Sequence, residues 1–106
     1  SSDLTELNSN GIRICLLSRE VRKNGMLVEL TASEFKLLRL FMENPNIVLS
    51  PEQILSRLWD CDENFIDSNT LTVYIRRLRT KIEDNPAEPR NIVTVRRMGY
   101  RWNSTD

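Results

Sequence analysis

The sequence predicts a single α+β domain over residues 1–106, in which an antiparallel sheet is followed by three helices and a C-terminal β-hairpin. Three observations support this order. Short β-rich runs with Asn-Gly pairs fill residues 3–30, apolar residues then recur at helical spacing over residues 31–83, and two further β-rich runs lie within residues 91–102. A chain of 106 residues, 40% of them hydrophobic, can bury a modest core without disulfide or metal staples.

The N-terminal segment is predicted to form three or four short strands. Residues 12–17 are rich in β-forming side chains, and residues 4–7 can add an edge strand. Asn24-Gly25 lies between two short β-rich runs and predicts a tight hairpin, because both residues tolerate a positive φ. Asn10-Gly11 has the same turn chemistry.

The first two helices each begin with a capping box. In this motif the side chains at its two ends bond to backbone amides that the first helical turn leaves unpaired. Thr31 and Glu34 form one such pair, and Ser50 and Gln53 form the other. Two helix starts are therefore fixed by local sequence alone.

The third helix is predicted over residues 68–83. At about 100° per residue, its apolar residues form a narrow stripe: Leu71, Ile75, Leu78 and Ile82. The opposite side collects polar and basic residues: Asn69, Thr72, Val73, Arg76, Arg77 and Thr80. The helix is expected to join the core on one face and to present a basic face to solvent.

Charge is divided unevenly along the chain, although the net charge is zero. Residues 1–68 contain seven lysines and arginines against eleven acidic residues, whereas residues 69–106 contain eight against four. This segregation favours a surface that meets a polyanion. An unevenly charged, solvated surface is the alternative.

Enzymatic chemistry is not predicted. The chain has no histidine, which excludes Ser-His-Asp and Cys-His catalysis, and its 3 glycines form no phosphate-binding loop. The start of a calcium-binding loop is imitated by Asp60, Asp62 and Asn64. However, Phe65 stands at the sixth position, where such a loop needs glycine, and Leu71 stands at the twelfth, where it needs a bidentate carboxylate. We therefore expect neither a metal site nor a cofactor.

The remaining composition indicates a cytoplasmic protein. No apolar run approaches the length of about 20 residues that a membrane helix needs. Cys15 and Cys61 lie outside any C-x-x-C pattern and are expected to be reduced, small apolar fillers.

The second helix, an irregular segment, the third helix and the hairpin together indicate a winged helix-turn-helix. In this arrangement the second helix of the motif enters the DNA major groove. Arginine matches guanine and phosphate bidentately, and threonine or valine can meet a thymine methyl. Arg96 and Arg97 at the hairpin tip suit a narrow minor groove. For Arg76, Arg77 and Arg79 the alternative is a solvated basic helix face.

Four stretches of the sequence resemble the C-terminal winged-helix effector domain of OmpR/PhoB-type response regulators. They are LTASEFKLL at 30–38, LSPEQIL at 49–55 followed by LW at 58–59, TLTVYIRRLRTKIE at 70–83, and IVTVR at 92–96 followed by GYRW at 99–102. The resemblance implies sequence-specific binding of double-stranded DNA, with tandem half-sites, as the output domain of a two-component transcriptional regulator. It also implies an N-terminal receiver domain and a homodimer of the full-length protein.

The resemblance assigns roles to individual residues. Base contacts in the major groove fall to Thr72, Val73 and Arg77, and phosphate contacts to Tyr74, Arg76, Arg79 and Tyr100. Arg96, helped by Thr94, falls at the minor-groove position of the wing. Many relatives have a basic residue at Asn69, an acidic one at Thr72 and small residues at the wing tip. Arg97 is therefore expected either to add a backbone contact or to lie in solvent.

The loop 60–67 matches the segment that meets RNA polymerase in activators of this family: Asp60, Asp62, Glu63, Asn64 and Phe65 carry this prediction. A solvated connecting loop is the alternative. A winged helix used as a protein–protein module, without DNA binding, is the rival function, and salt dependence separates the two. The operator sequence, the stimulus, the partner kinase and the choice between activation and repression do not follow from the sequence.

Overall fold

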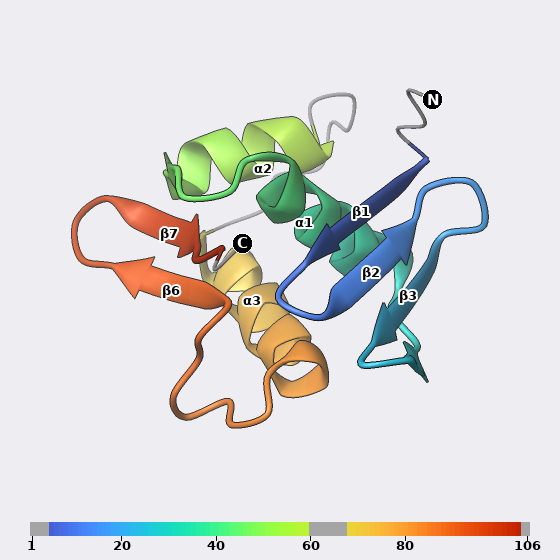
Figure 1. The fold of residues 1–106 in the computed structure, drawn as a ribbon. Helices are drawn as coiled ribbons and strands as arrows, with labels where there is room; N and C mark the ends of the chain where they lie inside the picture. Colours follow the sequence, from blue (N-terminus) through green and yellow to red (C-terminus); the bar gives the residue numbers. More distant parts are fainter. Residues whose placement is uncertain (1–4, 60–67, 105–106) are drawn as a thin grey trace.

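The computed structural model describes residues 5–59 and 68–104, with the side chains of residues 59 and 68–70 outside the description. The predicted order of sheet, helices and hairpin is confirmed (Figure 1). The strands of the first sheet are β1 (Glu6–Ser9), β2 (Ile12–Cys15), β3 (Glu20–Lys23) and β4 (Met26–Val28). The helices are α1 (Ala32–Glu43), α2 (Pro51–Trp59) and α3 (Ser68–Ile82). The strands of the second sheet are β5 (Val48–Leu49), β6 (Ile92–Val95) and β7 (Gly99–Trp102).

The N-terminal sheet is a four-stranded antiparallel meander in the order β1-β2-β3-β4. Both Asn-Gly pairs adopt the positive φ that tight hairpin turns require: 54° and 79° at Asn10-Gly11, and 53° and 87° at Asn24-Gly25. The edge strand β1 begins at Glu6, two residues later than its predicted start. Side chains alternate across the sheet, so that Ile14 and its partner Val21 face the core.

Both predicted capping boxes are present. The Glu34 amide donates to Thr31 Oγ1 at 3.3 Å, and the Thr31 amide donates to Glu34 Oε1 at 3.1 Å. Ser50 and Gln53 repeat this reciprocal pattern at 3.2 and 3.1 Å. Since each cap satisfies amides that no carbonyl of the helix can reach, α1 and α2 begin where the sequence predicts.

The helix α1 lies at the centre of the core and contacts both other helices, the N-terminal sheet and β7. Its Leu37, Leu38 and Phe41 side chains have no exposed surface. The apolar stripe predicted on α3 is buried against this core, from Leu71 to Ile82. Figure 1 shows the N-terminal sheet and the β6–β7 hairpin on opposite sides of the helices. The face of α3 opposite its buried apolar stripe is left outside the core.

The hairpin belongs to a three-stranded sheet in the order β5-β7-β6, and β5 is an element that the sequence reading did not predict. Val48 and Leu49 pair with Arg101 and Tyr100. Gly99 permits this pairing, because a Cβ on Gly99 would lie 2.1 Å from the Leu49 carbonyl oxygen. Its φ of +137° also disfavours any other residue. The base of the hairpin is thus attached to the segment that precedes α2.

Candidate nucleic-acid interface

Seven of the eleven residues that the sequence predicts to contact DNA belong to α3, and four of these lie on its exposed outer face. Thr72, Arg76 and Arg77 are exposed, and 46% of the Val73 surface is accessible. Within the described part of the chain, no hydrogen bond or ion pair engages the guanidinium group of Arg76 or Arg77. These two arginines are available for an external anion.

The hairpin β6–β7 presents a second basic group. Arg96 and Arg97 are exposed in the turn, which the Met98 amide closes by donating to the Val95 carbonyl at 3.2 Å. Arg97 has a φ of 65°, a left-handed conformation that an arginine adopts only at some cost. The turn and the first residues of α2 enclose a groove of about 560 Å³. Its lining includes Arg96, Arg97 and Met98.

Arg79 links α3 to this hairpin. Its Nε donates to the Ile92 carbonyl at 3.1 Å, and its Nη2 donates to Thr94 Oγ1 at 2.7 Å. The guanidinium carbon lies 5.9 Å from the centroid of the Tyr100 ring, within the range of a cation–π contact. Burial is the main cause that lowers the pKa of Arg79, while the nearby Glu83 carboxylate opposes this shift. The half-buried Arg79 therefore contacts both strands of the hairpin.

Tyr74 and Tyr100 occupy the border between the core and the outer face. Both are half-buried and pack against the core cluster. Thr94 on β6, which pairs with Tyr100 in the sheet register, is exposed while its hydroxyl accepts the hydrogen bond from Arg79. The predicted residues of α3 and the hairpin are thus brought into one surface through the contact between Arg79 and Thr94.

A partly buried ion pair attaches the end of α3 to the beginning of α1. Lys81 Nζ lies 2.7 Å from Glu34 Oε1, and only 2% of the Glu34 side chain is exposed. Burial acts to raise the pKa of Glu34, but the hydrogen bonds from Lys81 and from the Thr31 amide, together with the positive charges of Lys81 and Arg77, outweigh it and leave the pKa below its ordinary value. The sequence indicated the capping role of Glu34 but gave no sign of its pairing with Lys81, 47 residues away.

The residue after α3, Glu83, holds the loop that leads to the hairpin. Its buried carboxylate accepts hydrogen bonds from three successive backbone amides, those of Arg90, Asn91 and Ile92, at 3.1, 2.8 and 3.0 Å. The loop 84–91 is therefore closed onto the end of α3. Sequence reasoning placed the end of the helix near Glu83 but not this function, because the three amides belong to a later segment.

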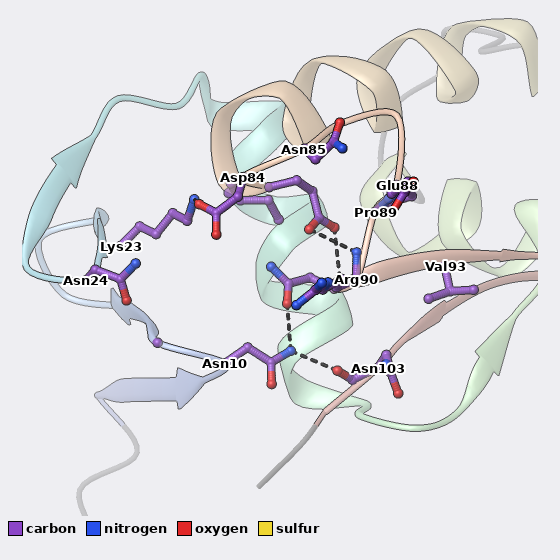
Figure 2. Close-up of a pocket in the computed structure, with 14 residues that line it drawn as sticks. Asn10, Lys23, Asn24, Asp84, Asn85, Glu88, Pro89, Arg90, Val93 and Asn103 are labelled. Atoms are coloured by element: carbon purple, nitrogen blue, oxygen red, sulfur yellow. Dashed lines mark hydrogen bonds and ion pairs between the residues drawn. The ribbon is translucent and has the colours of Figure 1, made fainter.

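A polar pocket of about 790 Å³ lies between this loop and the turns of the N-terminal sheet (Figure 2). Lys23 extends from β3 to an ion pair with Asp84. Asn10 Nδ2 donates to Asn91 Oδ1 and to the Asn103 carbonyl, both at 2.8 Å. These bonds connect the first sheet to the loop and to the segment after β7, so the pocket marks a junction between the two sheets.

Some of the predicted site residues lie outside the description. This holds for the side chain of Asn69 and for the whole loop 60–67, which includes Cys61 and the predicted polymerase contacts. In residues 5–59 and 68–104, no cluster of three metal-ligating side chains occurs. No helix in these ranges is both long and apolar enough to span a membrane. Cys15 is half-buried and forms no disulfide.

Comparison with known proteins gives a consistent group of relatives. The family "Transcriptional regulatory protein, C terminal" matches residues 24–102. The transcriptional regulatory protein YvrH of Bacillus subtilis is 45% identical over 83 residues, which cover 78% of this chain and 35% of YvrH. The sensory transduction protein RegX3 of Mycobacterium leprae is 39% identical over 99 residues, covering 92% of this chain and 49% of RegX3. The chain thus spans less than half the length of these curated relatives.

Solved structures with the same fold include response regulators and isolated DNA-binding domains. The response regulator DrrB of Thermotoga maritima, an OmpR/PhoB homologue, aligns with a TM-score of 0.85 and 27% identity, over 94% of this chain and 45% of DrrB. The DNA-binding domain of Klebsiella pneumoniae RstA, solved with the RstA box, aligns with a TM-score of 0.81 and 27% identity, over 92% of this chain and 96% of that domain. The predicted winged-helix architecture is confirmed.

Proposed function

Because the chain belongs to the family of C-terminal domains of transcriptional regulatory proteins, we propose that it is the DNA-binding output domain of an OmpR/PhoB-type response regulator. The observation that carries the proposal is the joining of two basic elements into one surface. Arg76 and Arg77 on α3 are exposed beside a hairpin that exposes Arg96 and Arg97. A basic helix face beside a basic hairpin, the wing, is suited to adjacent grooves of one duplex.

The proposed division of roles is the one that the resemblance to OmpR/PhoB-type effector domains implies, and the exposure of these residues is compatible with it. Arg77, with Thr72 and Val73 on the same face, reads base edges in the major groove. Arg76 binds phosphate, and the hydroxyl groups of Tyr74 and Tyr100 do so at the border of the surface. Arg96 enters the minor groove beside the recognition helix. Asn69 and Arg97 add backbone contacts.

Salt dependence of binding tests the proposal. Labelled duplexes selected from a random pool are titrated with the protein, and the dissociation constant is measured at several salt concentrations. Each phosphate contact contributes a slope of about 0.9 in the logarithm of affinity against the logarithm of salt. Arg77→Gln should weaken binding to the selected sequence, whereas Arg22→Gln, an equal charge change on the N-terminal sheet, should not. Salt-independent binding to a protein partner, with no duplex selected, would favour the protein–protein module instead.

We further propose that the full-length protein combines this domain with a receiver domain and acts as a homodimer on tandem half-sites. One copy offers one recognition helix and one wing, so a single half-site supports only weak binding. Joining two copies makes the second binding event intramolecular and raises the overall affinity. Tethered copies should bind two half-sites about one helical turn apart far better than one copy binds one half-site. Equal affinities would contradict this arrangement.

The proposed contact of the loop 60–67 with RNA polymerase rests on the sequence alone. The loop contains four carboxylates, which favours a basic protein surface over DNA. Replacing Asp62 and Glu63 by alanine should leave DNA affinity unchanged and abolish activated transcription in a reconstituted assay. Full activation by this variant would place the polymerase contact elsewhere.

A further inference from the structure

Arg79 differs from its neighbours Arg76 and Arg77 in where its hydrogen-bond donors point. Two of its donors are used by acceptors of β6, the Ile92 carbonyl and Thr94 Oγ1, and its guanidinium lies over the Tyr100 ring of β7. Arg76 and Arg77 are exposed and have no such partners in the described part of the chain. Two of the five N–H donors of Arg79 are thus used within the protein, and the three contacts restrict the orientations in which it could bind a phosphate.

The contacts of Arg79 fix both strands of the wing relative to α3. The two hydrogen bonds lie at the first and third residues of β6, and the ring contact lies on β7, opposite Thr94 in the register. A planar guanidinium can donate in two directions while its face meets an aromatic ring, whereas a lysine ammonium cannot reproduce this geometry. Arg79 thus defines the angle at which the wing leaves the recognition helix.

We propose that Arg79 is a positioning residue, which sets the wing for minor-groove entry through Thr94 and Tyr100, rather than a phosphate ligand. This inference rests on the proposed function and refines the role that the resemblance assigns to Arg79. Arg96 lies two residues after Thr94, in the turn that follows β6. A change in the angle between the wing and α3 therefore displaces Arg96 from the groove. The loss of Arg79 should therefore act through Arg96.

The first test separates the effect of the planar guanidinium geometry of Arg79 from the effect of its positive charge. The dissociation constants of Arg79→Lys and Arg96→Ala are compared on duplexes whose flanks are rich in A·T or in G·C. Arg79→Lys keeps the charge, yet it should lose the preference for A·T-rich flanks to the same extent as Arg96→Ala. In the Arg96→Ala background, Arg79→Lys should change this preference no further. An unchanged preference in Arg79→Lys, or additive losses in the double variant, would overturn the inference.

The second test uses the salt slope with a matched variant. Arg76→Gln should reduce the slope by about 0.9, the value expected for one lost phosphate contact, whereas Arg79→Gln should reduce it by less than half of that. Equal reductions by the two variants would show that Arg79 binds phosphate. Ile92→Val serves as a stability control, because it trims the core at the same strand and leaves every Arg79 acceptor in place. It should preserve the flank preference.

A third measurement needs no DNA and keeps the inference separate from the proposed function. Hydrogen exchange of the β6–β7 amides should accelerate by about tenfold or more in Arg79→Lys, while the amides of α3 keep their protection. Arg76→Lys should leave both groups unchanged. If wild-type protein bound no duplex, the proposed function would fail while this exchange result could still stand. Unaltered wing protection in Arg79→Lys would refute the positioning role even if DNA binding were intact.

Discussion

The middle and the C-terminal end of α3 use their charged side chains in opposite ways. Arg76 and Arg77, in the middle of the helix, are exposed and make no ion pair within the described residues. The charged residues around its C-terminal end are each bound to another element: Arg79 to the wing, Lys81 to the start of α1, and Glu83 to the following loop. The C-terminal end holds the helix against three neighbours, while the middle of the helix leaves its arginines exposed to solvent.

This contrast shows why a count of charges is a poor guide to a binding surface. Of the four basic residues between 76 and 81, two are directed to solvent and two are engaged by the protein itself. The two exposed residues are followed by the two engaged ones within six positions of one helix. Substitution of an exposed arginine should therefore change the affinity for DNA alone. Substitution of an engaged residue should also change the folded protein, at the wing for Arg79 and in the free energy of unfolding for Lys81.

The largest expected effect is the loss of the Glu83 carboxylate at the anchored end. Glu83→Ala removes the acceptor of three backbone amides in a buried position, and a buried donor without a partner costs about 1–3 kcal/mol. We expect the free energy of unfolding, measured by urea denaturation, to fall by about 3 kcal/mol. Glu88→Ala, an exposed residue of the same loop, should leave it nearly unchanged. A loss as small as that of Glu88→Ala would show that water replaces the carboxylate at these amides.

The second expected effect lies in the exposed part and concerns affinity alone. Arg77→Ala should weaken binding to a selected duplex by about 1–3 kcal/mol and relax the choice of base at one position, because a bidentate guanine contact is lost. Its unfolding free energy should remain close to that of the wild type, since within the described residues this guanidinium makes no hydrogen bond or ion pair and acts on the buried Glu34 only through its charge. Equal weakening on random DNA would make Arg77 a phosphate ligand. A marked loss of stability would break the contrast between the two parts of α3.

The sequence predicts the features that depend on neighbouring residues. Both capping boxes, both Asn-Gly turns and the buried stripe of α3 follow from spacings of a few residues, and all are present. The strand β5 could not be predicted, because two residues carry no periodicity and their partner strand lies about fifty positions later. The anchoring contacts of Arg79 and Lys81 could not be predicted for the same reason, because their partners lie in other elements of the chain. They depend on which elements the fold brings beside α3, and local sequence does not record this.

The smallest expected effect concerns the ion pair between Lys81 and Glu34, and it depends on pH. Lys81→Met removes the partner of a carboxylate that is only 2% exposed, while the Thr31 amide still donates to it. We expect a loss of about 1–2 kcal/mol in unfolding free energy at neutral pH. Arg39→Met provides the matched control, since its pair with Glu43 lies on the surface and contributes little.

The sign of the pH dependence follows from the direction of the Glu34 shift. The pKa of Glu34 in the folded protein lies below its ordinary value of 4.5, so the unfolded chain binds a proton more readily than the folded one. The stabilisation is therefore complete above about pH 4.5 and is lost as the pH falls through the folded pKa. Without Lys81 the folded pKa rises, and this loss with falling pH becomes smaller. The curves of wild type and Lys81→Met should converge in acid, whereas those of wild type and Arg39→Met should stay close at every pH. A constant gap between wild type and Lys81→Met down to low pH would mean that Lys81 stabilises the protein through its packing, and that the end of α3 is not held by this charge.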